Sequence, residues 1–161
     1  GLDTFLECAD RISQVMPNVQ FLVVGSKRLP EWAAAHPLLA SGRVHYRPKS
    51  GRPELWLAAL DLFLYPSRFD SFGMVISEAQ ALGIPVLTSR RVGASECLPE
   101  DYAPWLIERP SSEAFTELAL KLLADEKTRQ GLAAVGLKSV VALDQDNYAR
   151  TTVATILNQK R

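Results

Sequence analysis

Cysteine and histidine are scarce in this chain of 161 residues, which contains two of each. Cys8 and Cys97 lack metal-ligand spacing, and two cysteines are too few for a disulfide framework, so we expect reduced thiols. His36 and His45 have no partner at the spacing of a nucleophile or a metal site, and a lone histidine is more often structural. The sequence therefore predicts neither a metal centre nor a histidine-based active site.

An excess of one charge and long apolar runs are also absent. Lys and Arg number 18, and Asp and Glu number 18, so the formal net charge is zero. Bulk electrostatics therefore favour neither nucleic acid nor an anionic membrane as a partner. No apolar stretch approaches the roughly 20 residues of a membrane span, and nothing resembles a secretory signal. These absences favour a cytoplasmic protein, and the length fits a single domain over residues 1–161.

The most informative stretch covers residues 62–89, LFLYPSRFDSFGMVISEAQALGIPVLTS. It predicts a strand over residues 62–65 that ends at Pro66, a polar loop over 67–71, and a helix over about 74–82. Gly83 and Pro85 end that helix, and residues 86–88 predict a second buried strand. Parallel sheets are built from such strand–loop–helix–strand units. The helix start would therefore lie at the carboxyl edge of the strands, where open α/β sheets bind ligands and free N–H groups attract anions.

Two carboxylates flank the start of this predicted helix, Asp70 in the loop and Glu78 one turn into the helix. Gly73 lacks a Cβ, so a phosphate or sugar can approach its backbone closely. Helical periodicity predicts a buried stripe, with Glu78 at its margin, made of Val75, Ala79 and Leu82. Taken alone, the residues leave two interpretations open. The carboxylates bind a ligand, or Asp70 caps a turn and Glu78 complements the helix dipole.

Strands and helices are also expected in the rest of the chain. The predicted strands cover residues 19–24, 43–47 and 105–107, and short helical or irregular structure is expected over 29–39. The predicted helices cover residues 4–16, 53–60, 111–124 and 127–143, with a last helix from Asp144 to residue 158. Ser111 or Ser112 is the expected N-cap of the helix over 111–124. Leucine and alanine at this spacing indicate a core rather than a cofactor site.

The central stretch resembles the donor-site signature of the glycosyl transferases group 1 family, retaining enzymes that use nucleotide sugars on a GT-B fold. In that signature two glutamates are separated by seven residues, and here Asp70 takes the first position, with a side chain shorter by one methylene. After residue 89, Gly93 and Ala94 stand where the family typically has two glycines. The residues that carry the resemblance are Pro66-Ser67, Asp70, Phe72-Gly73-Met74-Val75, Glu78-Ala79 and Gly83-Ile84-Pro85-Val86.

The resemblance implies an α/β, Rossmann-like parallel sheet with helices on both faces, which is one half of a GT-B fold. The family's first strand in this half carries an arginine and a lysine for the donor diphosphate. That strand would lie before Gly1, so the chain is expected to begin within the donor domain. Lys27 and Arg28 occupy a different position and are not assigned that role. An unfilled sheet position should leave an exposed apolar edge or face.

The resemblance also implies roles for individual residues. Glu78 would accept hydrogen bonds from the ribose hydroxyls. Asp70 would hold hydroxyls of the transferred sugar without acting as a nucleophile. No divalent metal or other cofactor is expected besides the donor itself. The backbone N–H groups of the helix start would bind phosphate or sugar oxygens, and the implied donor-binding residues are Phe72, Gly73, Met74, Val75, Ser67 and Arg47.

The implied function is the donor-binding half of a retaining glycosyltransferase, and the fragment alone would be inactive. The enzyme would move a hexose from a UDP-sugar, with GDP-mannose as the second choice. The acceptor would be a glycan or lipid-linked molecule in lipopolysaccharide or cell-surface polysaccharide synthesis. It would bind to an amino-terminal domain outside this chain, and that domain could hold the enzyme at the inner face of the plasma membrane.

Two alternatives to this function stay open. The first is a sugar-nucleotide epimerase of the same fold, which would need additional acid and base groups in the cleft. The second is a non-catalytic sugar-nucleotide-binding or interaction module. An NAD-binding domain lacks support, because no G-x-G-x-x-G motif follows a predicted strand.

Overall fold

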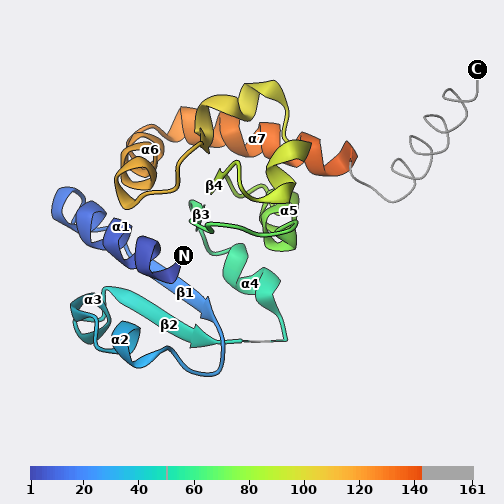
Figure 1. Ribbon diagram of the computed structural model, residues 1–161. Coiled ribbons are helices and arrows are strands. Elements are labelled where there is room, and N and C mark those ends of the chain that lie inside the picture. The colour runs from blue at the N-terminus through green and yellow to red at the C-terminus, as the bar shows by residue number, and fades with distance from the viewer. Residues whose placement is uncertain (50, 143–161) are drawn as a thin grey trace, which may run out of the picture.

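Strands and helical segments alternate along the chain, as the sequence predicts, and the paired strands are parallel (Figure 1). The computed structural model describes residues 1–49 and 51–142. The strands are β1 (Phe21–Gly25), β2 (Val44–Pro48), β3 (Phe63–Tyr65), β4 (Val86–Ser89) and β5 (Leu106–Ile107). The helices are α1 (Leu2–Val15), α2 (Glu31–Ala34), α3 (Pro37–Ala40), α4 (Pro53–Leu57), α5 (Met74–Ala81), α6 (Ser112–Ala124) and α7 (Glu126–Ala142), with 3-10 helices η1 (Gly93–Cys97) and η2 (Glu100–Trp105).

The predicted helix boundaries agree with these bounds to within a few residues. Gly83 follows the end of α5 with a φ of 72°, in the left-handed region expected of a residue that ends a helix. Ser111 rather than Ser112 is the N-cap of α6, since its Oγ accepts a hydrogen bond from the N–H of Ala114 at 3.2 Å. The predicted helix that begins at Asp144 lies outside the described residues.

The strands form two sheets, one in the order β1-β2 and one in the order β3-β4-β5. Helices α2 and α3 lie beside the first sheet, and α5, α6 and α7 surround the second (Figure 1). Within the described residues, no pairing joins β1 to β3. A cavity of about 520 Å³ lies between these two strands, in the part of the sheet where the sequence predicts an exposed apolar edge or face. Its apolar lining includes Leu2, Phe5, Phe21, Val23, Leu62 and Leu64.

Alternating side chains of β4 enter two different cores, because the strand is covered on both faces. Leu87 belongs to the main core, which combines residues of α1, β1, β2, β5 and α6. Val86 belongs to a smaller core beneath α4 and α5. Every residue of β4 is buried, as is typical of a parallel strand with helices on both sides. The covered sheet confirms the predicted α/β fold with helices on both faces.

The buried hydroxyl of Tyr102 completes the hydrogen bonding of β4. It donates to the carbonyl of Val86 at 2.9 Å and accepts from the N–H of the same residue at 3.1 Å. These backbone groups need a partner because β5 pairs with β4 only from Thr88 onward. A side chain 16 residues away therefore replaces a strand partner at the start of β4.

The buried face of α5 differs from the predicted one. Of the predicted stripe of Val75, Ala79 and Leu82, only Ala79 is fully buried, and Leu82 is 43% exposed. Ile76 and Gln80 are buried in their place. The reason is that α7 also packs on α5, and the side chain of Gln80 lies against Gly136 of that helix. Glu78 consequently faces solvent rather than the margin of a buried stripe.

None of the helices in the described residues is both long enough and apolar enough to span a lipid bilayer.

Candidate functional site

The loops that follow β3 and β4 are joined at the carboxyl ends of these neighbouring strands. Asp70 and Val92 form a parallel β-bridge between the two loops. Four hydrogen bonds support this bridge. The donors and acceptors are Ser89 Oγ and the carbonyl of Ser67 (3.0 Å), the N–H of Asp70 and the carbonyl of Arg91 (3.3 Å), the N–H of Gly93 and the carbonyl of Asp70 (3.1 Å), and the N–H of Ala94 and the carbonyl of Phe72 (2.7 Å). The two loops therefore form one structural unit.

The carboxylate of Asp70 is held by two donors. The hydroxyl of Tyr65 donates to Oδ2 at 2.7 Å, and the N–H of Phe72 donates to Oδ1 at 3.0 Å. The hydrogen bond from Tyr65 and, to a smaller extent, the hydrogen bond from Phe72 hold the pKa of Asp70 below its usual range. Burial is the larger cause, and the hydrogen bond to Asp70 the smaller one, of a pKa of Tyr65 raised to about 12. Asp70 is therefore charged at neutral pH and fixed in orientation, with lone pairs left for a ligand's hydroxyl groups.

Gly73 sets the position at which α5 begins. Its φ is 83°, and a Cβ there would lie 2.6 Å from Cγ1 of Val92, so glycine is required for two reasons. No side chain caps α5. Among the described residues, the N–H groups of Met74 and Val75 donate no hydrogen bond to a protein group. The start of α5 thus offers free donors and a positive dipole end to an anion or to sugar oxygens.

The structure groups the predicted site residues into three places. Glu78 and Met74 are exposed on α5. Arg47 is exposed on β2, in the other sheet, and its Nη1 donates to the carbonyl of Tyr46 at 3.0 Å rather than to a residue of the loop after β3. Ser67, Asp70, Phe72 and Gly73 lie together in that loop, while Met74, Val75 and Glu78 follow along α5.

Tyr65, Val92 and Gly93 support the site and were not among the predicted site residues. Tyr65 falls within the strand that the sequence predicts over residues 62–65. Its hydroxyl could have indicated a role in the site, because a half-buried tyrosine needs a hydrogen-bond partner and Asp70 follows five residues later. No local pattern shows that the loop containing Val92 pairs with the loop containing Asp70.

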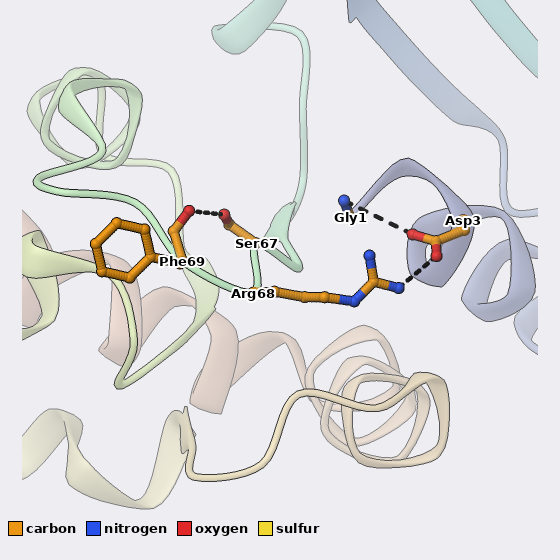
Figure 2. A network of polar contacts seen from close by, with 5 residues as sticks. All are labelled: Gly1, Asp3, Ser67, Arg68 and Phe69. Carbon is orange, nitrogen blue, oxygen red and sulfur yellow. Dashed lines mark hydrogen bonds and ion pairs between the residues drawn. The ribbon is translucent and has the colours of Figure 1, made fainter. Parts of the chain in front are cut away.

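An ion pair ties the loop after β3 to the first turn of α1. The guanidinium of Arg68 contacts the carboxylate of Asp3, and Ser67 Oγ donates to the carbonyl of Phe69 at 3.0 Å (Figure 2). The side chain of Arg68 runs toward α1, and the ring of Phe69 points the opposite way (Figure 2). The hydrogen bond from Arg68 lowers the pKa of Asp3 to about 2.

The Asp3–Arg68 pair predicts a loss of stability in acid. The pKa of Asp3 is lower in the folded state than the value of about 3.9 expected of the unfolded chain. The stabilisation is therefore present above about pH 4 and is lost as the pH falls toward 2. Because the side chains of Arg68 and Asp3 are 63% and 44% exposed, water screens the pair, and Asp3→Asn should cost less than about 1 kcal/mol at neutral pH.

Urea unfolding measured across this pH range checks the prediction. Asp3→Asn should flatten the dependence of the unfolding free energy on pH, whereas the matched variant Asp61→Asn should keep the wild-type slope. An unchanged slope in Asp3→Asn would show that the ion pair contributes nothing.

Metal ligands do not gather in the part of the chain that the structure describes. No three histidine, cysteine, aspartate or glutamate side chains come together there in an arrangement that could hold a metal ion.

Comparison with known proteins identifies the family. Residues 1–138 match the family model described as "Glycosyl transferases group 1". The chain belongs to this family. The structure of WaaG, a glycosyltransferase involved in lipopolysaccharide biosynthesis, is similar to this group 1 domain with a TM-score of 0.77 and 25% sequence identity over 92% of this chain and 40% of WaaG. The family match and this likeness confirm the predicted Rossmann-like half of a GT-B fold.

Two further proteins place the group 1 domain among its relatives. The GDP-mannose-dependent monoacylated alpha-(1-6)-phosphatidylinositol monomannoside mannosyltransferase of Corynebacterium glutamicum is 28% identical, over 88% of this chain and 39% of that protein. Anabaena HepE in complex with UDP-glucose has a TM-score of 0.70 and 21% identity over 91% of this chain and 44% of HepE, which shows a shared fold. The chain thus spans between 39% and 44% of the length of these three proteins.

Proposed function

We propose that this chain is the nucleotide-sugar-binding part of a retaining glycosyltransferase that transfers a hexose. The observation that carries the proposal is the placement of a fixed, charged Asp70 beside the uncapped start of α5, with Glu78 exposed one turn further along. Free N–H groups suit a diphosphate, and carboxylates suit the hydroxyl groups of ribose and sugar. The match to the glycosyl transferases group 1 family supports the transferase class.

Each residue of the proposed site has a distinct task. Asp70 accepts hydroxyls of the transferred sugar, and its two existing hydrogen bonds suit it to orienting that sugar rather than to attacking it. The N–H groups of Met74 and Val75 bind phosphate oxygens, and they stabilise the negative charge that grows on the diphosphate as the bond to the sugar breaks. Glu78 holds the ribose hydroxyls, and Arg47 reaches the donor from the other sheet. The proposal includes no divalent metal and no further cofactor.

A UDP-sugar is the donor that we propose first, and GDP-mannose is the second choice. The structure of HepE with bound UDP-glucose supports the first, and the name of the GDP-mannose-dependent relative supports the second. The proposed acceptor is a glycan or glycolipid in lipopolysaccharide or cell-surface polysaccharide synthesis, in line with the descriptions of WaaG and of the mannosyltransferase.

We also propose that residues 1–161 form one domain of a longer enzyme whose remaining part binds the acceptor. The relatives are more than twice as long as the stretch that this chain covers. The cavity between β1 and β3 offers the place for the additional strand that the family resemblance implies. The proposed reaction lies on the cytoplasmic side of the membrane.

Calorimetric titration tests the proposed function. We expect at least one of UDP-glucose, UDP-N-acetylglucosamine and GDP-mannose to bind this chain, and NAD to give no signal. The nucleotide that binds best identifies the base. The proposal is overturned if none of the three binds either to this chain, shown to be folded by cooperative unfolding in urea, or to the full-length protein.

A further inference from the structure

The hydroxyl group of Tyr65 is not needed for the packing of the strand that carries it. Tyr65 ends β3, and its ring lies beside the ring of Phe63, with 5.9 Å between the ring centroids. Both rings pack against the smaller core beneath α4 and α5. A Cβ at Gly73 would lie 3.6 Å from Cε1 of Tyr65, so the ring also lies close to the backbone where α5 starts. A phenylalanine would make the same contacts, so packing does not account for the hydroxyl.

The turn that follows Asp70 does not account for the hydroxyl either. The N–H of Phe72 donates to Oδ1 of Asp70, and an aspartate at the start of a turn commonly accepts such a bond from two residues ahead. The hydroxyl of Tyr65 donates to the other oxygen, Oδ2, from the end of a strand. This second bond adds nothing to the turn. It stops the carboxylate from rotating, because each of the two oxygens then has a fixed donor.

The hydroxyl of Tyr65 stays a donor at neutral pH. Burial and, to a smaller extent, the hydrogen bond to Asp70 raise its pKa to about 12, so it keeps its proton. Asp70 is charged and can only accept, and hydrogen bonds to an ionised group are roughly twice as strong as those between neutral groups. A carboxylate has about four acceptor positions, so each oxygen keeps a position for a ligand's hydroxyl group.

We propose that Tyr65 is a positioning residue for the transferred sugar and acts through Asp70. The inference rests on the proposed function, in which Asp70 binds that sugar. Each side chain that a ligand must immobilise on binding lowers the affinity. The hydroxyl of Tyr65 immobilises the carboxylate before the donor arrives, so less affinity is lost when the sugar binds. The nucleotide makes no contact with Asp70 in the proposed site, so the effect is confined to the sugar.

Calorimetric titration with UDP and UDP-glucose tests this role. The measured quantity is the sugar ratio, defined as the dissociation constant of UDP divided by that of UDP-glucose. GDP and GDP-mannose replace this pair if the base proves to be guanine. Tyr65→Phe should lower the sugar ratio about 2- to 10-fold and leave the affinity for UDP unchanged. The titrations use this chain, or the full-length protein if only that protein binds the donor.

A double-mutant cycle shows whether Tyr65 acts through Asp70. Asp70→Ala should lower the sugar ratio about 10- to 100-fold. Adding Tyr65→Phe to Asp70→Ala should lower it no further, because the carboxylate that the hydroxyl positions is then absent. Tyr46→Phe is the control, since it removes a hydroxyl that donates to the carbonyl of Ser26 beside the other sheet. This control should keep the wild-type sugar ratio.

Four results would overturn the positioning role alone, provided that urea unfolding shows the variants to be folded. They are an unchanged sugar ratio in Tyr65→Phe, an unchanged ratio in Asp70→Ala, a further fall when the two substitutions are combined, and an equal loss of affinity for UDP and UDP-glucose in Tyr65→Phe. The last of these is the result expected if the hydroxyl only stabilises the loop. Failure of the wild-type protein to bind any nucleotide sugar would instead overturn the proposed function, and the positioning role with it.

Discussion

Gly93→Ala is expected to destabilise the chain by about 3 kcal/mol and to weaken nucleotide-sugar binding together with it. A Cβ at position 93 would lie 2.2 Å from the carbonyl oxygen of Ser71 and 3.1 Å from the Cα of Phe72. Both are backbone atoms, so no side chain can rotate away. The two loops would separate, and the hydrogen bonds that Gly93 and Ala94 donate to Asp70 and Phe72 would lengthen or break.

Gly131→Ala provides the matched control for this substitution. Gly131 lies within α7, and a Cβ there would meet nothing within 4 Å. Alanine has the higher helix propensity, so this variant should gain about 0.5–1 kcal/mol. Urea unfolding of both variants measures the difference. If Gly93→Ala were as stable as Gly131→Ala, the close contact between the two loops would be absent.

Glu78→Gln should weaken the binding of UDP-glucose about 10- to 100-fold while leaving the fold intact. The expected size follows from hydrogen bonds to a charged group, which contribute about 1.5–3 kcal/mol, with about 1.4 kcal/mol for each tenfold change in affinity. The stability should hold because Glu78 is exposed on α5. Calorimetric titration measures the change in affinity.

Glu126→Gln is the control for Glu78→Gln, since it removes the same charge from the exposed first turn of α7. It should bind UDP-glucose as wild type does. Equal affinities for Glu78→Gln and wild type would favour the other interpretation of the sequence, in which Glu78 only complements the helix dipole. A fall in both variants would point to long-range electrostatics rather than to a contact.

The strand–loop–helix–strand unit could be predicted from the sequence because its boundaries depend on local chemistry. Pro66 ends a strand by lacking a backbone donor, and Gly83 adopts a left-handed φ after the helix. Gly73 also has a positive φ at the helix start. These constraints act within a few residues, so they can be recognised without knowledge of the rest of the fold.

The features that the sequence did not reveal depend on contacts between distant segments. Gln80 is buried because α7 covers it, although glutamine on a helix is usually exposed. The hydroxyl of Tyr102 donates to the carbonyl of Val86, a strand residue 16 positions earlier in the sequence. The pairing of Asp70 with Val92 likewise requires that β3 and β4 already lie together. Tertiary packing therefore determines these details of the site, and local sequence patterns could not predict them.

Mapping UDP-glucose onto the chain by amide chemical shifts is the most direct test of a donor site at the start of α5. The N–H groups of Met74 and Val75 are free of protein partners among the described residues, so a bound phosphate or sugar should shift their signals most, together with that of Gly73. The account predicts saturable shifts at these three residues. Saturable shifts confined to residues around the cavity between β1 and β3, with none at the start of α5, would contradict it.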